Sequence, residues 1–246
     1  MEVHHHPEVE KKGFKEYLLE GLMIFLAVFM GFIAENIREG ISDRQKGKDY
    51  IRSFVQDLRR DTANFSILLA YDERKITALN GIFTCFTTVG KNTSSSSCLV
   101  PIVQNFLSDR QANFTDGTME QLKNAGGLRL LAEADKDSIL SYNHNIQAAV
   151  NFQATELQQS QDNVRNTYNQ VGNFMSGAAS HPDSVAVDEK TSLLITNDKM
   201  LLNKFFNDVS FYRRAHTMQM VIIKSMQAKA TGIIQYFEYK YNLKGE

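Results

Sequence analysis

Two glutamates stand inside the most apolar stretch of the chain, where an ionisable side chain is a candidate for chemistry. Glu20 and Glu35 are 15 positions apart, which separates them by about 22 Å along a helix. A carboxylate inside a bilayer is costly unless it faces a partner helix, a water-filled path or the interface. Either glutamate could therefore titrate in a proton path through a multi-helix assembly. Alternatively, both could reach toward the membrane surfaces and contact water.

The helical spacing places both glutamates on one face together with small residues. At 100° per residue, this stripe consists of Glu20, Ala27, Gly31, Ala34 and Glu35. Ala27 and Gly31 form a small-xxx-small pair, which lets two helix backbones approach closely in lipid. The opposite face carries Phe25, Phe29 and Phe32. We therefore expect the stripe to contact another helix and the phenylalanines to contact lipid.

The only two cysteines, Cys85 and Cys98, flank a polar segment rich in serine and threonine. A flexible loop between two cysteines imposes little strain on disulfide geometry. Closing a loop of this size stabilises a protein by roughly 3 kcal/mol in the chain-entropy model. Two unpaired thiols at helix ends remain the alternative. The spacing matches no usual zinc pattern, so we predict a disulfide and an oxidising compartment.

The histidines do not predict a reaction centre. The run His4-His5-His6 could bind a metal ion weakly, but it is more typical of a solvated tail or a binding epitope. His216 lies on the apolar face of the last predicted helix, so a hydrogen-bonded core histidine is expected. No phosphate loop, nucleophile elbow, HExxH or dinucleotide motif occurs. We predict no enzyme activity, no metal site and no cofactor.

Charge and composition limit the possible partners. The net charge is −1, whereas a nucleic-acid-binding domain normally carries a basic excess. Hydrophobic residues make up 43% of the chain and charged residues 22%, which is ordinary for a folded protein. The composition therefore argues against a nucleic-acid partner.

Residues 17–37 are predicted to form a transmembrane helix. These 21 residues would span about 31 Å, which matches a hydrocarbon core. The segment is apolar on every side, and a helix of that kind needs lipid or a large protein core around it. A cleaved signal peptide is the competing interpretation, but no small-x-small cleavage site follows the apolar run. The predicted organisation is a cytoplasmic tail at 1–16, a membrane helix at 17–37 and a helical domain at 38–246.

The orientation signals conflict. Lysines precede the apolar segment, but more basic residues follow it, so counting Lys and Arg alone places the large domain in the cytoplasm. That rule weakens for large translocated domains. The cysteine pair and the serine-rich loop favour the exterior. We predict the N-terminus inside and the domain outside.

The remainder of the chain has helical periodicity. Apolar residues recur at steps of three and four over three stretches, and we expect the first to be continuous with the apolar segment. The second stretch carries Ile139, Tyr142, Ile146, Val150, Leu157, Val164, Tyr168, Val171 and Met175. An average step of 3.5 residues indicates coiled-coil-like packing at shallow crossing angles. Strand patterns are scarce, so an all-α antiparallel helical bundle with long helices is predicted.

Particular residues are expected in the core and at helix ends. The predicted core contains Phe54, Leu58, Phe65, Ile146, Leu157, Phe205, Tyr212 and Ile223. Thr115 or Asp116 should cap a short helix that ends at Gly126-Gly127, and Asn197 or Asp198 should cap the last helix. The glutamines and asparagines between 153 and 173 suggest a solvated face, or alternatively amide contacts with another protomer.

Two segments carry a resemblance to a known family. The first is the N-terminal segment Met1-Glu-Val-His-His-His-Pro7, together with Ala34-Glu-Asn-Ile-Arg-Glu39 after the apolar run. The second is Thr118-Met-Glu-Gln-Leu-Lys-Asn-Ala-Gly-Gly-Leu-Arg-Leu130. They resemble a Bacteroidetes family of single-pass membrane proteins with an N-terminal His-His-His-Pro motif. The resemblance covers most of the chain. It implies a bacterial inner-membrane anchor and a periplasmic helical domain, and it implies no established activity.

Two functions of different classes follow. The first is a membrane-anchored interaction or scaffold protein, or an accessory subunit of a membrane complex, whose partners are lipid and further copies or other membrane proteins. The second is a proton-coupled or channel-forming component that uses Glu20 or Glu35. The second requires a carboxylate in a helix-lined path, whereas the first does not.

Overall fold

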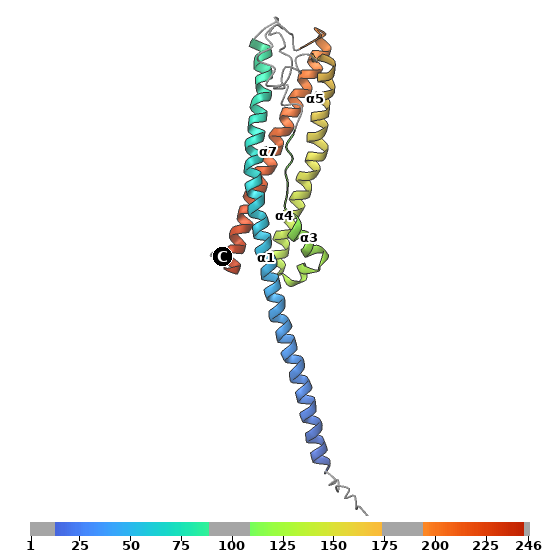
Figure 1. Ribbon diagram of the computed structural model, residues 1–246, viewed down its shortest axis with the longest axis vertical. Helices are drawn as coiled ribbons and strands as arrows, with labels where there is room; N and C mark the ends of the chain where they lie inside the picture. Colours follow the sequence, from blue (N-terminus) through green and yellow to red (C-terminus); the bar gives the residue numbers. More distant parts are fainter. Residues whose placement is uncertain (1–12, 89–108, 174–193, 244–246) are drawn as a thin grey trace, which may run out of the picture. The chain divides into compact units, whose positions relative to one another are not determined.

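The computed structural model describes residues 13–88, 109–173 and 194–243 (Figure 1). The elements are α1 (Phe14–Thr88), α3 (Gly117–Asn124), the 3-10 turn η3 (Gly127–Leu130), α4 (Glu133–Phe152), the π-helical turn η4 (Gln153–Leu157), α5 (Gln158–Val171) and α7 (Lys199–Tyr241). These described ranges contain no β-strand, only an isolated bridge between Gly172 and Leu194. The all-α prediction is confirmed.

The chain divides into two compact units, Met1–Asp49 and Tyr50–Glu246. Helix α1 contributes to both, because it runs unbroken from Phe14 to Thr88. The sequence predicted this continuity, since only Gly40 weakens the helical pattern after the apolar segment. The residues of α1 in the first unit are almost entirely exposed.

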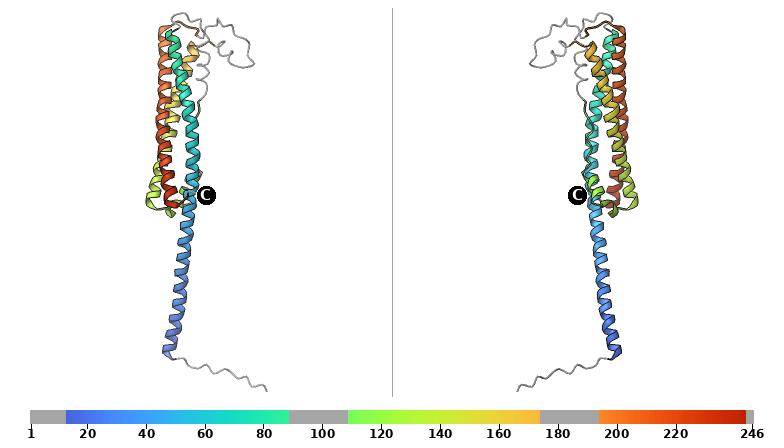
Figure 2. Two further views of the ribbon diagram at one scale, coloured as in Figure 1. Left: turned by 90° about the vertical axis from the view of Figure 1, so that its left-hand side faces the viewer. Right: turned by 90° about the vertical axis from the view of Figure 1, so that its right-hand side faces the viewer.

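Three long helical segments lie side by side in the second unit (Figures 1 and 2). They are residues 50–88 of α1, the consecutive elements α4, η4 and α5, and α7. Helix α7 runs in the opposite direction to the other two segments (Figure 1). The predicted antiparallel bundle of long helices is therefore confirmed.

Heptad spacing explains why α1 and α7 pack along their length. On α1 the buried positions include Ile51, Phe54, Leu58, Asp61, Phe65, Leu68, Asp72, Lys75, Leu79 and Ile82. On α7 they include Phe205, Val209, Tyr212, His216, Gln219, Ile223, Met226, Ala230, Ile233 and Phe237. Both series alternate steps of three and four, so each helix keeps one seam toward its neighbours. All eight predicted core residues are buried.

The predicted seam on the second long segment was wrong at Val150, which is 43% exposed. Ala149 and Gln153 are buried instead, and η4 begins at Gln153. A π-helical turn holds one residue more than an α-helical turn, so it shifts the seam by one position. Leu157, Val164 and Val171 are spaced by seven, and extending that series backward leads to Val150. The extrapolation failed because the wide turn lies between them.

Helix α3 is capped by α1 rather than by its own N-terminal residue. Asp116 occupies the cap position, but its side chain accepts no capping hydrogen bond. The carboxylate of Asp57 accepts the backbone N–H of Thr118 (3.3 Å), and that of Asp61 accepts the backbone N–H of Thr115 (2.8 Å). The prediction of capping by Thr115 or Asp116 was therefore wrong. A carboxylate 61 positions away in sequence takes that role.

The other predicted helix ends are confirmed. Gly126 follows α3 in the left-handed region, with φ of +67°, where a residue lacking Cβ avoids strain. The Asp198 carboxylate accepts the backbone N–H groups of Met200 and Leu201 at 2.8 and 3.3 Å. It thereby satisfies two of the free donors at the start of α7.

Candidate functional site

The apolar N-terminal part of α1 is the first feature with a functional implication. Among the described residues, α1 is the one helix long and apolar enough to cross a membrane, and its most apolar stretch has no buried residue in the structure. A Cβ added at Gly31 would meet no atom within 4 Å, so the predicted stripe is open to a neighbouring helix. On the opposite face the rings of Phe25 and Phe29 stack with centroids 5.9 Å apart.

The predicted stripe residues Glu20, Ala27, Gly31, Ala34 and Glu35 all lie on the exposed part of this helix. Glu35 forms an ion pair with Arg38, whose Nε donates to the carboxylate at 2.9 Å. The pair balances the charge of Glu35 within the helix itself. The stripe is therefore compatible with a helix–helix contact, and Glu35 is not an isolated carboxylate.

The predicted disulfide joins two cysteine side chains that lie outside the described part of the structure. Cys85 belongs to the backbone of α1, but its side chain and all of Cys98 lie outside the described residues. The disulfide stays a prediction.

A layer of buried polar side chains crosses the second unit and separates two hydrophobic clusters. One cluster includes Leu68, Ala149 and Ile223, and the other includes Leu79, Leu157 and Val209. Every long segment carries buried polar residues near the boundary between the two clusters. They are Asp72 and Lys75 on α1, Gln153 on η4, Gln161 on α5, and His216 and Gln219 on α7.

His216 is the centre of this layer. Its Nδ1 lies 2.8 Å from Oδ1 of Asp72, and its Nε2 lies 3.2 Å from Oδ1 of Asp109. Asp72 also accepts two hydrogen bonds from the side-chain amide of Gln219, at 2.9 and 3.1 Å. The imidazole of His216 is completely buried. His216 therefore lies between the Asp72 carboxylate of α1 and the Asp109 carboxylate of the segment that precedes α3.

Lys75 and Tyr212 also interact with the carboxylate of Asp109. Nζ of Lys75 lies 3.0 Å from Oδ1 of Asp109, and the Tyr212 hydroxyl donates to the same oxygen at 2.7 Å. The ammonium group also lies 5.4 and 5.5 Å from the ring centres of Tyr71 and Tyr212, at cation–π distances. A buried lysine is costly unless it is paired in this way.

The charges of the layer balance when His216 is protonated. Burial lowers the pKa of His216, but its interactions with the carboxylates of Asp109 and Asp72 outweigh burial and raise that pKa above the ordinary value. Burial raises the pKa of Asp109, yet His216 and Lys75 outweigh burial and lower it. Two carboxylates then face one imidazolium and one ammonium, while Gln153, Gln161 and Gln219 contribute uncharged amides.

The wide turn η4 supplies the amide of Gln153 to the layer. Its Nε2 donates to Oε1 of Gln219 at 2.9 Å, which links the second long segment to α7. Gln153 is 7% exposed and Gln161 is 3% exposed. The prediction of a solvated glutamine face was wrong for these two residues, because they occupy seam positions of the bundle.

The layer can specify how the helices align, but it presents no group to a substrate. The side chains of Lys75 and His216 are at most 1% exposed. Polar residues at seam positions disfavour every alignment in which they lose their partners, so such layers select one register. Sequence reasoning did not identify this layer, and in the sequence Asp72 only interrupts the apolar pattern of the first long helix. The signal it missed is that polar seam positions on α1 and α7 coincide in the folded bundle.

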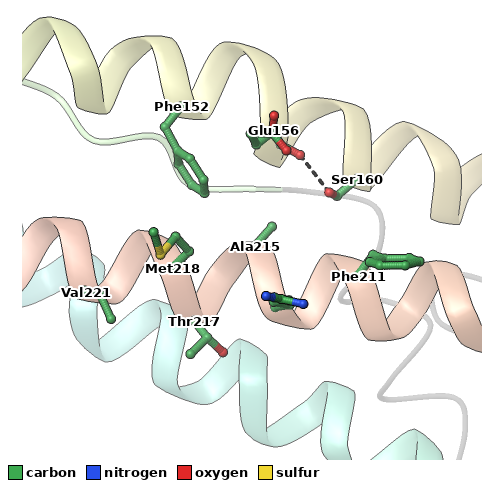
Figure 3. A pocket seen from close by; sticks show the side chains of 9 residues that line it. Phe152, Glu156, Ser160, Phe211, Ala215, Thr217, Met218 and Val221 are labelled. Carbon is green, nitrogen blue, oxygen red and sulfur yellow. Dashed lines mark hydrogen bonds between the residues drawn. The ribbon is translucent and has the colours of Figure 1, made fainter.

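A groove runs along the outside of the bundle between α7 and the segment around η4 (Figure 3). Its volume is about 440 Å³. It is lined by Phe152, Glu156, Ser160, Phe211, Arg214, Ala215, Thr217, Met218 and Val221. Phe152 and Met218 project into it from opposite walls (Figure 3). No sequence prediction anticipated this groove.

Comparison with protein-family models, with curated proteins and with solved structures found no match.

Proposed function

We propose that this chain is a single-pass membrane protein whose helical bundle serves as an interaction scaffold or as an accessory subunit of a membrane complex. The observation that carries the proposal is the exposed apolar part of α1. Leaving that many large apolar side chains in water is unfavourable by roughly 25 cal/mol per Å². Lipid around residues 17–37 removes this cost.

The bundle supports a binding role rather than a catalytic one. Its buried polar layer is suited to holding three helical segments in one alignment. Its groove offers exposed apolar side chains to another molecule, including Phe211, which is 61% exposed. A rigid helical body that presents such a groove is suited to recognition of a partner helix.

We place the anchor in a bacterial inner membrane and the bundle in the periplasm. Labelling of single cysteines with a membrane-impermeant maleimide in intact cells tests this, in a chain that carries Cys85→Ala and Cys98→Ala. Met200 is 83% exposed on α7, and Gly13 has open space around it. Met200→Cys should be labelled from outside, whereas Gly13→Cys should be labelled only after permeabilisation. The reverse pattern would place the bundle in the cytoplasm.

Membrane attachment is tested separately by fractionation. The full chain should sediment with membranes, resist carbonate extraction and dissolve only in detergent. A chain that lacks residues 14–37 should appear in the soluble fraction. Recovery of the full chain in the soluble fraction would overturn the anchoring proposal.

The stripe offers a contact within the membrane. Small residues allow close backbone approach, and a partner helix shields the glutamates from lipid. Gly31→Leu should weaken association between copies, whereas the matched change Phe29→Leu should leave it nearly unchanged. Equal crosslinking of both variants would contradict a contact along the stripe.

A proton path through Glu20 or Glu35 is the competing function. The ion pair between Glu35 and Arg38 opposes it at one of the two positions, because this carboxylate already contacts a guanidinium of the same helix. Proton flux into liposomes that contain the full chain distinguishes the two functions. We expect no flux above empty liposomes, and flux abolished by Glu20→Gln would favour the path.

A further inference from the structure

We propose that the groove between η4 and α7 binds the same groove of a second copy of this chain, with Arg214 of each copy against Glu156 of the other. This inference rests on the proposed scaffold function and identifies its partner. It arises from three features: an outward apolar stripe on α7, the wall formed by the π-helical turn, and one charge of each sign on the two walls.

The outward stripe on α7 has the spacing of a second helix–helix contact. Phe211, Met218 and Val221 are 61%, 50% and 57% exposed. With Arg214 they follow steps of three, four and three, on the side of the helix opposite the seam that faces the bundle. Apolar side chains at this spacing are what one helix presents to another. All of these residues belong to the second unit, Tyr50–Glu246.

The facing wall owes its form to η4. Phe152, Glu156 and Ser160 line the groove at steps of four. The wide turn directs Gln153 and Leu157 to the core, where they are 7% and 2% exposed, and leaves Glu156 exposed between them. Glu156 therefore lines the groove from within the wide turn, while its neighbours Gln153 and Leu157 face the core. π-helical turns are frequent at functional sites.

The two charged side chains indicate which partner fits. Arg214 and Glu156 are the charged residues that line the groove, and neither forms an ion pair within the described part of the chain. In a contact with two-fold symmetry, the same patch is used twice, so Arg214 meets Glu156 of the other copy and the reverse contact also forms. One pair of residues thus provides two complementary contacts.

Anchoring in one membrane favours this partner further. Two copies held in the same bilayer have a high effective concentration, so an interface of moderate size can be occupied. Burial of Phe211, Met218 and Val221 in the groove of a second copy would also remove exposed apolar surface from both bundles.

The test is photocrosslinking of the full chain in native membranes. Benzoylphenylalanine replaces Phe211, and two differently tagged copies are expressed together so that a dimer is identified by both tags. The matched control position is Tyr239, which is 88% exposed on the same helix and lies outside the groove. We expect a two-tag product from position 211 and none from position 239. Absence of that product at 211 would overturn the proposal.

Charge reversal then tests the pairing. Glu156→Arg and Arg214→Glu should each reduce the dimer at least tenfold, because each creates two like-charge contacts in the symmetric dimer. The double variant should return the dimer to within about twofold of the original. Glu73→Arg, an exposed change on α1 outside the groove, should have no effect. Circular dichroism verifies that every variant keeps its helices.

The other outcomes are equally decisive. A dimer that is insensitive to both single reversals forms elsewhere, for example along the membrane stripe, and would overturn the proposal. Failure of the double variant to recover would show that the two residues do not face each other. Membrane fractionation of the same samples reports separately on the proposed anchoring, so its failure is distinguishable from a failure of the dimer.

Discussion

The two hydrophobic clusters and the polar layer between them occupy the same seams but act in different ways. Burial of apolar side chains stabilises the clusters and does not depend on the orientation of particular groups. Apolar residues of similar size could therefore replace one another there. In the layer each side chain depends on specific partners: His216 contacts both Asp72 and Asp109, and Lys75 contacts Asp109. Burial of apolar side chains therefore stabilises the bundle, whereas the specific contacts of the polar layer favour one alignment of its helices.

Removal of one charge from the layer should have the largest effect. Lys75→Ala leaves Asp109 buried without its ammonium partner, and breaking a buried pair typically costs about 3–5 kcal/mol. Urea unfolding of the full chain in detergent, followed by circular dichroism, measures the loss. The double variant Lys75→Met, Asp109→Leu should recover most of it, because no charge is then left unpaired. A loss below about 1 kcal/mol for Lys75→Ala would mean that the layer is more hydrated than its burial indicates.

Truncation in an apolar cluster should cost slightly less. Leu157 is 2% exposed, so Leu157→Ala is expected to cost about 2–5 kcal/mol. Val150 is 43% exposed and provides the matched control, because Val150→Ala should change the free energy of unfolding by less than about 0.5 kcal/mol. Equal losses at both positions would contradict the shift of register at η4.

A covalent link between Cys85 and Cys98 would add a restraint that neither kind of seam provides. Alkylation without reductant, followed by mass spectrometry, should label neither cysteine. Reduction should lower the free energy of unfolding by roughly 3 kcal/mol in the chain-entropy model. Full labelling of both residues before reduction would remove the disulfide and weaken the case for a periplasmic bundle.

The pH dependence of the layer should be smaller and of defined sign. The folded-state pKa of His216 is raised, so its stabilisation is complete below the unfolded value of about 6.5. Stability should fall as the pH rises from there through the folded-state pKa, by about 1.4 kcal/mol for each unit of difference. Unfolding curves between pH 6 and 9 measure this, and His216→Gln should remove the dependence. The Asp109 carboxyl, whose pKa is lowered, titrates below this window.

Much of the fold could be predicted because it depends on periodicity. The eight predicted core residues are buried, and α1 is continuous, since both follow from spacing along single helices. The site could not be predicted in the same way. Asp109 belongs to a segment without periodicity, and its contacts with Lys75 and His216 join residues distant in sequence. Helix η4 was missed because an added residue in a turn leaves no compositional mark.

That added residue has a consequence for how the bundle tolerates changes in length. Before η4 the seam follows Ile139, Tyr142, Ile146, Ala149 and Gln153, and after it Leu157, Gln161, Val164 and Val171. Deletion of one exposed residue of the turn, such as Ala154, would bring the later positions into phase with the earlier ones on an unbroken α-helix. The bundle should therefore accept a deletion here that would rotate any other seam by 100°. The same deletion would move Glu156 relative to Arg214. We therefore expect this one variant to keep the fold and to lose the proposed contact between copies.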